Sequence, residues 1–181
     1  MSELESGQTA VVVVTGAMAS GKSTIAQALA ERLPVAAHVR GDAFRRFIVS
    51  GREPMTAPLS ERARTQLALR QNLAARTAEL FAADGITAIV QDLYLGADLR
   101  AMVERIRYRP LYVVVLSPTA QAIRQRERAR SKSGYESWTI EDFAAAVDAT
   151  PRLGLRINTS DLTVEQSVDQ ILRDQALAKV E

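Results

Sequence analysis

The sequence predicts an α/β fold in which a five-stranded parallel sheet is flanked by helices. Apolar segments rich in β-branched residues alternate five times with segments that favour helices. This order requires a crossover between successive strands and is typical of parallel sheets. The first apolar segment carries four consecutive valines, as expected for a central strand that is covered on both faces. We expect the five strands at residues 10–15, 35–40, 86–91, 111–116 and 153–158.

Helix boundaries follow from proline, glycine and capping residues. A helix at residues 22–33 is stopped by Pro34, because the proline ring does not fit a helix interior. Thr163 and Gln166 have the spacing of a capping box, which starts a final helix that runs to about residue 179. A long helix at residues 61–83 has four candidate core residues: Leu67, Leu73, Leu80 and Phe81.

Composition indicates an ordinary globular domain. The chain has 181 residues, of which 47% are hydrophobic and 24% charged. A net charge of +2 gives no bulk electrostatic reason to expect nucleic acid or a membrane as a partner, and the lack of cysteine excludes thiolate chemistry. No apolar run approaches the roughly 20 residues of a membrane span. We expect a cytoplasmic protein with a flexible tail at residues 1–9 and one domain at residues 10–181.

A glycine-rich loop joins the first strand to the first helix. Gly16, Gly21, Lys22 and Ser23 match the pattern G-x-x-x-x-G-K-[ST], with the strand and helix that this motif requires on either side. The loop N–H groups and the positive end of the helix would cradle nucleotide phosphates. Lys22 would reach the β- and γ-phosphates, and the Ser23 hydroxyl would bind Mg²⁺. The predicted nucleotide-binding residues of the loop are Gly16, Ala17, Met18, Ala19, Ser20, Gly21, Lys22, Ser23 and Thr24.

Asp42 follows the second strand and is the candidate general base. Ligands of parallel sheets bind beyond the carboxyl ends of the strands, so we expect Asp42 at the same edge as the phosphate loop. Its carboxylate would accept a proton from an acceptor hydroxyl beside the γ-phosphate. Arg45 lies one helical turn later and is a candidate for binding the acceptor. The alternative is that Asp42 only caps the next helix and Arg45 is a solvated charge.

Asp92 closes the third strand and is a candidate metal ligand. A carboxylate at this place can hold Mg²⁺ directly or through water, or it can bind the acceptor. A strand-ending cap is the alternative. Tyr94 follows and is a candidate for lining the acceptor pocket, with packing as the alternative.

An arginine-rich segment follows the fourth strand, and we expect a lid at residues 124–138. On a helix, Arg126 and Arg130 would share one face. A basic segment that closes over the γ-phosphate neutralises developing charge and excludes water. A solvated helix face is the alternative. Arg152, beside the fifth strand, is expected near the nucleotide base.

These features resemble the small-molecule kinases of the P-loop superfamily, in particular the chloramphenicol phosphotransferase-like group. The resemblance rests on Val-Thr-Gly-Ala-Met-Ala-Ser-Gly-Lys-Ser, on Val-Gln-Asp after the third strand, on Arg-Glu-Arg-Ala-Arg-Ser-Lys-Ser-Gly-Tyr, and on the closing Pro-Arg-Leu-Gly-Leu-Arg-Ile-Asn-Thr-Ser-Asp-Leu-Thr. It implies transfer of the γ-phosphoryl group of ATP to a hydroxyl, with Asp42 as the base. The acceptor segment, residues 43–75, does not resemble chloramphenicol kinase itself, so that drug is not implied.

A second resemblance competes with the first. Arg40-Gly-Asp-Ala-Phe-Arg45 is similar to the aspartate-then-arginine signature of polynucleotide 5′-kinases. It implies that Arg45 contacts the 3′ phosphate of the acceptor. A polynucleotide would need a basic tunnel, which nearby arginines could supply. A nucleotide-binding switch without catalytic activity is the third hypothesis.

We expect, in sum, an ATP- and Mg²⁺-dependent phosphotransferase with a helical acceptor segment and an arginine-rich lid. Its partner would be a small hydroxylated molecule, such as an antibiotic or a nucleoside-like metabolite. Nucleic acid is expected only under the polynucleotide hypothesis.

Overall fold

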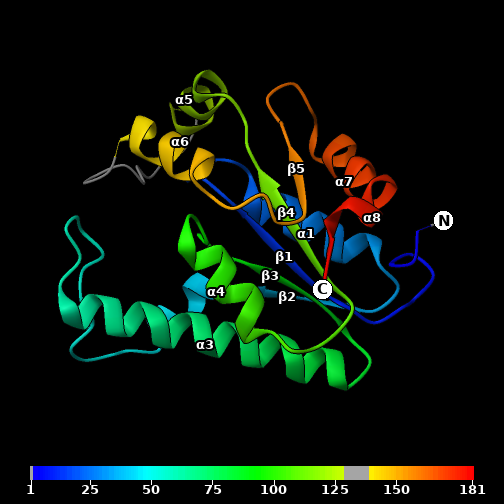
Figure 1. The fold of residues 1–181 in the computed structure, drawn as a ribbon, viewed down its shortest axis with the longest axis horizontal. Helices are drawn as coiled ribbons and strands as arrows, with labels where there is room; N and C mark the ends of the chain where they lie inside the picture. Colours follow the sequence, from blue (N-terminus) through cyan, green and yellow to red (C-terminus); the bar gives the residue numbers. More distant parts are fainter. Residues whose placement is uncertain (1, 129–138) are drawn as a thin grey trace.

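A parallel sheet with the strand order β2-β3-β1-β4-β5 lies at the centre of the protein (Figure 1). The structure is a computed structural model that describes residues 2–128 and 139–181. The five strands pair in parallel throughout, which confirms the predicted sheet. Their bounds are β1 (Val11–Gly16), β2 (Ala36–Arg40), β3 (Thr87–Gln91), β4 (Leu111–Leu116) and β5 (Leu155–Ile157).

The chain ends in a short antiparallel strand that the sequence did not predict. β6 (Lys179–Val180) pairs with the first residues of β4, whereas β5 pairs only with the later ones. The sheet formed by the described residues therefore has six strands. The helix predicted to run to residue 179 ends earlier, as α7 (Val164–Arg173), and the short α8 (Gln175–Ala178) leads into β6.

Helices cover both faces of the sheet (Figure 1). α1 (Lys22–Arg32) and α7 pack on the face that carries Val12 and Val14. α3 (Glu61–Ala83) and α4 (Ala97–Arg105) pack on the face that carries Val11 and Val13. Both sets of β1 side chains are fully buried, which explains why this strand shows no alternation of polar and apolar residues. The remaining helices of the described chain are α2 (Gly41–Arg46), α5 (Ala120–Arg128) and α6 (Ile140–Asp148).

The long helix α3 packs on the sheet through alanines and not through the predicted leucines. Its buried side chains include Ala74, Ala78 and Ala82, spaced four residues apart on one face. Leu80 is 72% exposed, and Leu73 and Phe81 also lie mostly outside the core. Small side chains allow the helix backbone to approach the sheet closely, so the face with the smallest residues is the buried one. Leu67 alone among the predicted core residues is half-buried, at the wall of a large cavity.

The N-terminal segment packs on the domain and does not form the predicted flexible tail. Leu4 is buried in the same core cluster as α1 and α7. Its backbone N–H donates a hydrogen bond to Gln175 Oε1 at 3.3 Å. The Tyr112 hydroxyl donates to Glu3 Oε2 at 2.9 Å. One buried leucine and one buried tyrosine therefore hold an otherwise polar segment in place.

No helix in the described residues is long and apolar enough to cross a membrane.

Candidate active site

A cavity of about 1340 Å³ opens at the carboxyl edge of the sheet. Its walls come from the phosphate loop, from α2 and the extended segment after it, from α3, and from the loop that follows β5. Ten residues that the sequence predicted for the site lie in these walls: Met18, Ala19, Gly21, Lys22, Ser23, Thr24, Asp42, Arg45, Asp92 and Arg126.

The phosphate loop is shaped by two glycines. Gly16 has a φ of 149° and lies against β4, where a Cβ atom would come within 2.4 Å of the Leu116 carbonyl oxygen. Gly21 has a φ of 96° and forms the N-cap of α1. The first turn of α1 contains no acidic residue, so the partial positive charge of the helix end is available to an anion. Lys22 Nζ donates to the Ala17 carbonyl oxygen at 2.8 Å.

The Ser23 hydroxyl donates a hydrogen bond to Gln91 Oε1 at 3.0 Å. Since its hydrogen is used, the lone pairs of Ser23 Oγ are left for a cation. Mg²⁺ prefers oxygen ligands and is commonly shared between a protein and substrate phosphates. The described residues contain no cluster of three or more His, Cys, Asp or Glu side chains suited to a metal. The donor set therefore fits Mg²⁺ that is held by Ser23 together with nucleotide phosphates.

Asp92 does not present the free carboxylate that we predicted as a metal ligand. The Arg70 guanidinium of α3 binds both of its oxygens, with Nε donating to Oδ2 at 2.6 Å and Nη2 donating to Oδ1. The Leu93 N–H donates to Oδ1 as well, at 2.7 Å. Burial alone would lower the pKa of Arg70, but the hydrogen bonds and charge of Asp92 raise it above its ordinary value. Asp92 is thus neutralised by Arg70, and Gln91 is the side chain that meets Ser23.

Asp92 is also in close contact with the start of α2. A Cβ atom on Gly41 would lie 2.3 Å from Asp92 Oδ2, so only glycine fits at this position without displacing the carboxylate. The contact places Asp42, the next residue, beside the Arg70–Asp92 pair.

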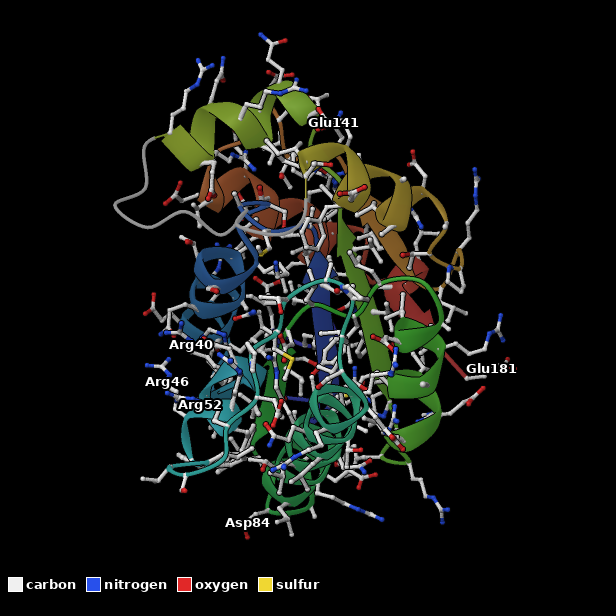
Figure 2. All side chains as sticks on the ribbon, turned by 90° about the vertical axis from the view of Figure 1, so that its left-hand side faces the viewer. Arg40, Arg46, Arg52, Asp84, Glu141 and Glu181 are labelled. Atoms are coloured by element: carbon white, nitrogen blue, oxygen red, sulfur yellow. The ribbon has the colours of Figure 1, made fainter. Side chains whose placement is uncertain are left out.

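The Asp42 carboxylate lies between two arginines. Arg40 Nε is 3.7 Å from Oδ1, and Arg46 Nη2 is 3.5 Å from Oδ2. Both arginines extend from the same side of the molecule (Figure 2). Asp42 Oδ1 is shielded from solvent and accepts no hydrogen bond from the described residues. This oxygen therefore has an unfilled acceptor position of the kind that a hydroxyl donor would occupy.

Arg45 brings a positive charge into the cavity wall. Its Nη2 donates to the Glu53 carbonyl oxygen at 2.8 Å. Burial, together with the charges of Arg52 and Arg70, lowers the pKa of Arg45. No carboxylate in the described part of the chain forms an ion pair with it. A negatively charged group on a ligand would be favoured at this place.

Arg126 links the phosphate loop to the loop after β5. Its Nη1 donates to the Ser20 carbonyl oxygen at 3.1 Å and to Thr159 Oγ1 at 3.2 Å, and its Nη2 donates to the Thr159 carbonyl oxygen. Thr159 is buried, and no sequence pattern predicts that it pairs with an arginine. Arg130 and residues 129–138 of the predicted lid lie outside the described residues.

Two residues that the sequence predicted for the site do not line the cavity. Tyr94 is fully buried in the core beneath α3 and α4, and does not line the cavity. Burial raises its pKa, as does the charge of Asp92. Arg152 is exposed and is not among the residues that line the cavity. The loop after β5 supplies cavity residues instead, among them Thr159 and Leu162.

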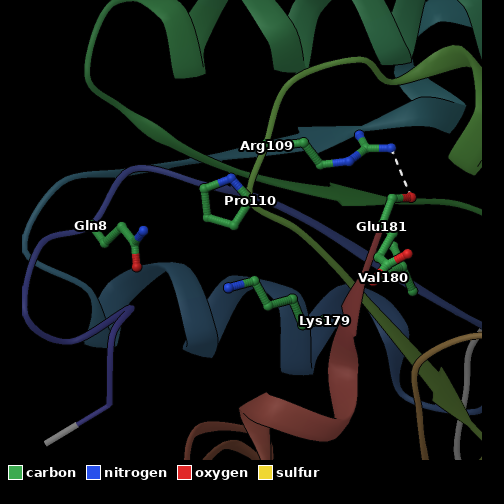
Figure 3. A pocket seen from close by; sticks show the side chains of 6 residues that line it. All are labelled: Gln8, Arg109, Pro110, Lys179, Val180 and Glu181. Carbon is green, nitrogen blue, oxygen red and sulfur yellow. Dashed lines mark hydrogen bonds between the residues drawn. The ribbon is translucent and has the colours of Figure 1, made fainter.

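A second hollow, of about 650 Å³, lies at the opposite edge of the sheet (Figure 3). Gln8 and Pro110 precede β1 and β4, and Lys179 to Glu181 close the hollow from the C-terminus. Arg109 Nη2 donates to the Glu181 carbonyl oxygen at 2.9 Å, the hydrogen bond drawn in Figure 3. This contact holds the chain end, and none of the predicted site residues takes part.

The phosphate loop, the parallel sheet and the cavity at its carboxyl edge are the features of a P-loop kinase fold. A family model described as "AAA domain" matches residues 11–150, and the chain belongs to this family. A search of curated proteins gave no match.

Solved structures with the same fold cover nearly the whole chain. A sugar kinase from a Janibacter species is 21% identical, with a TM-score of 0.68, over 94% of this chain and 96% of that one. The tunicamycin resistance protein of Deinococcus radiodurans is 14% identical, with a TM-score of 0.69, over 96% and 99%. The APS kinase of Mycobacterium tuberculosis, in complex with AMPPNP and APS, is 18% identical, with a TM-score of 0.64, over 93% and 98%. At these identities the likeness establishes the fold.

Proposed function

We propose that the protein transfers the γ-phosphoryl group of ATP to a hydroxyl group of a small molecule. One observation carries this proposal: the phosphate loop and the carboxylate of Asp42 line the same cavity. A triphosphate on the loop would direct its γ-phosphate toward the side of the cavity that holds Asp42. The sugar kinase and the APS kinase share this fold, which supports the same class of reaction.

In the proposed reaction the acceptor hydroxyl donates its proton to Asp42 as its oxygen bonds to the γ-phosphorus. The bond from that phosphorus to the oxygen bridging the β- and γ-phosphates breaks, and ADP leaves. Lys22, the loop N–H groups and Arg126 hold the phosphates and balance their charge. Mg²⁺, when bound with the nucleotide at Ser23, neutralises charge on the phosphate oxygens. Most of the rate enhancement would come from positioning and charge neutralisation.

Arg45 indicates the chemistry of the acceptor. Its guanidinium has no carboxylate partner in the described residues and lies in the cavity wall with Asp42. An acceptor with a carboxylate or phosphate group, in addition to its hydroxyl, would match this charge. We propose antibiotics and nucleoside-like metabolites as the acceptor classes. We also propose that the enzyme is cytoplasmic, where ATP is available.

A polynucleotide 5′-hydroxyl kinase is the second candidate function. It is supported by Arg45, which lines the same cavity as Asp42 and would bind a phosphate group of the acceptor. Under this hypothesis the Arg45→Gln variant would lose labelling of 5′-hydroxyl oligonucleotides. The protein would also bind these oligonucleotides with a steep dependence on salt concentration.

The test is a screen for ATP-dependent phosphorylation of hydroxylated antibiotics, nucleosides and 5′-hydroxyl oligonucleotides, with mass detection of the added phosphate. Asp42→Asn should reduce transfer at least a hundredfold while ATP binding persists, since a general base contributes about 10²–10⁴-fold. Asp84→Asn is the matched control, because Asp84 is exposed at the far end of α3 (Figure 2). Tight ATP binding with no phosphorylated acceptor would favour the switch hypothesis, and unchanged transfer by Asp42→Asn would remove Asp42 as the base.

A further inference from the structure

The cavity holds two side chains of opposite charge that have no ion-pair partner among the described residues. They are Arg45 of α2 and Asp98 in the first turn of α4, and both line the part of the cavity that is walled by α2, α3 and α4. We call this part the acceptor side. The Arg70–Asp92 pair on the same side is neutral as a unit. A ligand on the acceptor side therefore meets one uncompensated cation and one uncompensated anion in addition to Asp42.

The Arg45 guanidinium has a donor that is not used. Its Nε is shielded from solvent and donates no hydrogen bond within the described part of the chain, whereas Nη2 donates to the Glu53 carbonyl oxygen. Burial and the charges of Arg52 and Arg70 lower the pKa of Arg45, so its surroundings disfavour the positive charge. A buried donor without a partner costs free energy. A ligand anion that accepts from Nε would remove this cost and compensate the charge.

The Asp98 carboxylate is half-buried and has free acceptor positions. It forms no ion pair and accepts no hydrogen bond within residues 2–128 and 139–181. The backbone N–H of Asp98 donates to the Leu95 carbonyl oxygen at 3.1 Å. A carboxylate in a first turn also interacts with the positive end of its helix, but this interaction leaves its oxygens able to accept from a ligand. An ammonium group, with three donors and a positive charge, matches such a carboxylate.

The two charges approach the cavity from different sides. Figure 2 shows α2 and α4 on opposite sides of α3, and α3 packs against both. The side chains of Leu67 and Leu95 add apolar surface to the same cavity. Asp42 and Arg45 are about one helical turn apart on α2. A ligand hydroxyl at Asp42 and an anionic group at Arg45 would thus be close together, with a cationic group at Asp98 farther away.

We propose that the acceptor is a hydroxylated zwitterion, in which an anionic group that binds Arg45 and an ammonium group that binds Asp98 are separated by an apolar portion. This inference rests on the proposed function and narrows its substrate class. A neutral acceptor would leave both protein charges unpaired. A polynucleotide would bring only negative charge toward Asp98, and like charges repel.

The test is calorimetric titration of the full-length protein, saturated with AMPPNP and Mg²⁺, with three compounds of matched length. They are the zwitterion α-hydroxy-ε-aminocaproate, its deaminated analogue α-hydroxycaproate, and its decarboxylated analogue aminopentanol. The zwitterion should bind at least about tenfold more tightly than either analogue, because one hydrogen bond between charged groups typically contributes that factor or more.

Single variants assign each charge to its partner. Asp98→Asn should remove the advantage of the zwitterion over α-hydroxycaproate and leave the affinity for α-hydroxycaproate unchanged. Arg45→Gln should remove the advantage over aminopentanol and leave the affinity for aminopentanol unchanged. Glu61→Gln is the matched control, because Glu61 is also an acidic residue in a first helical turn but does not line the cavity. It should leave all three affinities unchanged.

The inference and the proposed function can fail separately. Binding of the zwitterion no tighter than that of either analogue would overturn the inference, and so would equal losses in Asp98→Asn and Glu61→Gln. Phosphorylation of an acceptor with a single charge or none, in the screen described above, would also overturn it while supporting the proposed function. Selective binding of the zwitterion without transfer of phosphate to any compound of that screen would count against the proposed function alone.

Discussion

Arg70 holds Asp92 through both carboxylate oxygens at the end of β3. The pair is nearly closed to solvent, with side chains 14% and 5% exposed. It joins the helix that forms one wall of the cavity to the strand next to β1. The pair thereby sets the position of α3 relative to the phosphate loop.

Removing one partner of this ion pair should destabilise the protein strongly. Arg70→Met leaves the buried Asp92 charge without compensation, which typically costs about 3–5 kcal/mol. Urea unfolding should show this loss as a lower midpoint. The double variant Arg70→Met/Asp92→Asn removes both charges and should recover a large part of it. A single variant as stable as the wild type would show that water, and not Arg70, solvates Asp92.

Tyr112 should make stability depend on alkaline pH. Burial and the hydrogen bond to Glu3 raise its pKa to about 12, from its ordinary value of 10.0. A raised pKa in the folded state favours the protonated phenol, so its contribution is complete below pH 10 and is lost as the pH rises toward about 12. Melting temperatures measured between pH 9 and 12 should fall more steeply for the wild type than for Tyr112→Phe. Parallel curves would show that ionisation of Tyr112 does not affect the stability of the fold.

Larger side chains on the buried alanine face of α3 should destabilise the protein. Ala78→Leu forces a larger side chain between helix and sheet and should cost about 1–3 kcal/mol. Leu80→Gln changes a side chain that is 72% exposed and should alter the free energy of unfolding by less than about 0.5 kcal/mol. Both can be measured by chemical denaturation. A larger loss of stability for Leu80→Gln than for Ala78→Leu would mean that the leucine face of α3 is buried in solution.

Replacing Arg126 with lysine should lower the rate of phosphoryl transfer, even though the positive charge is kept. Lysine keeps the charge but lacks the planar fork that reaches both the Ser20 carbonyl and Thr159. Arg126→Lys should therefore lower the rate of phosphoryl transfer roughly tenfold or more, in line with the loss of one oriented donor. Thr159→Val is the matched control, because it removes only the contact to Oγ1. Equal rates for the wild type and Arg126→Lys would show that Arg126 contributes only its positive charge.

The fold could be predicted largely because parallel strands and phosphate loops have strong local signals. The strand at residues 111–116 matches β4 at both ends. The remaining strands differ by a few residues at their ends. β6 could not be predicted, because a strand of two residues shows no periodicity. Its pairing also depends on β5 being short, which leaves the first residues of β4 free to pair with β6.

The buried face of α3 and the pairing of Asp92 show where sequence reasoning fails. The helix offered one face with leucines and another with alanines, and the distance between α3 and the sheet decides which is buried. Side chains alternate across a strand, so only one of Gln91 and Asp92 can point toward Ser23. The register that selects Gln91 is a tertiary property. Arg70 was missed for the same reason, since nothing in its sequence neighbourhood marks it as the partner of a residue twenty-two positions later.

The close contact between Gly41 and Asp92 has a practical consequence for changing acceptor preference by protein engineering. Position 41 allows no added atom, and the neighbouring Arg70–Asp92 pair tolerates little change. Met55, Thr56 and Leu59 line the same cavity from an irregular segment between α2 and α3. A mutant library aimed at new substrates is best concentrated on these three positions, because their variation leaves the ion pair and the phosphate loop intact.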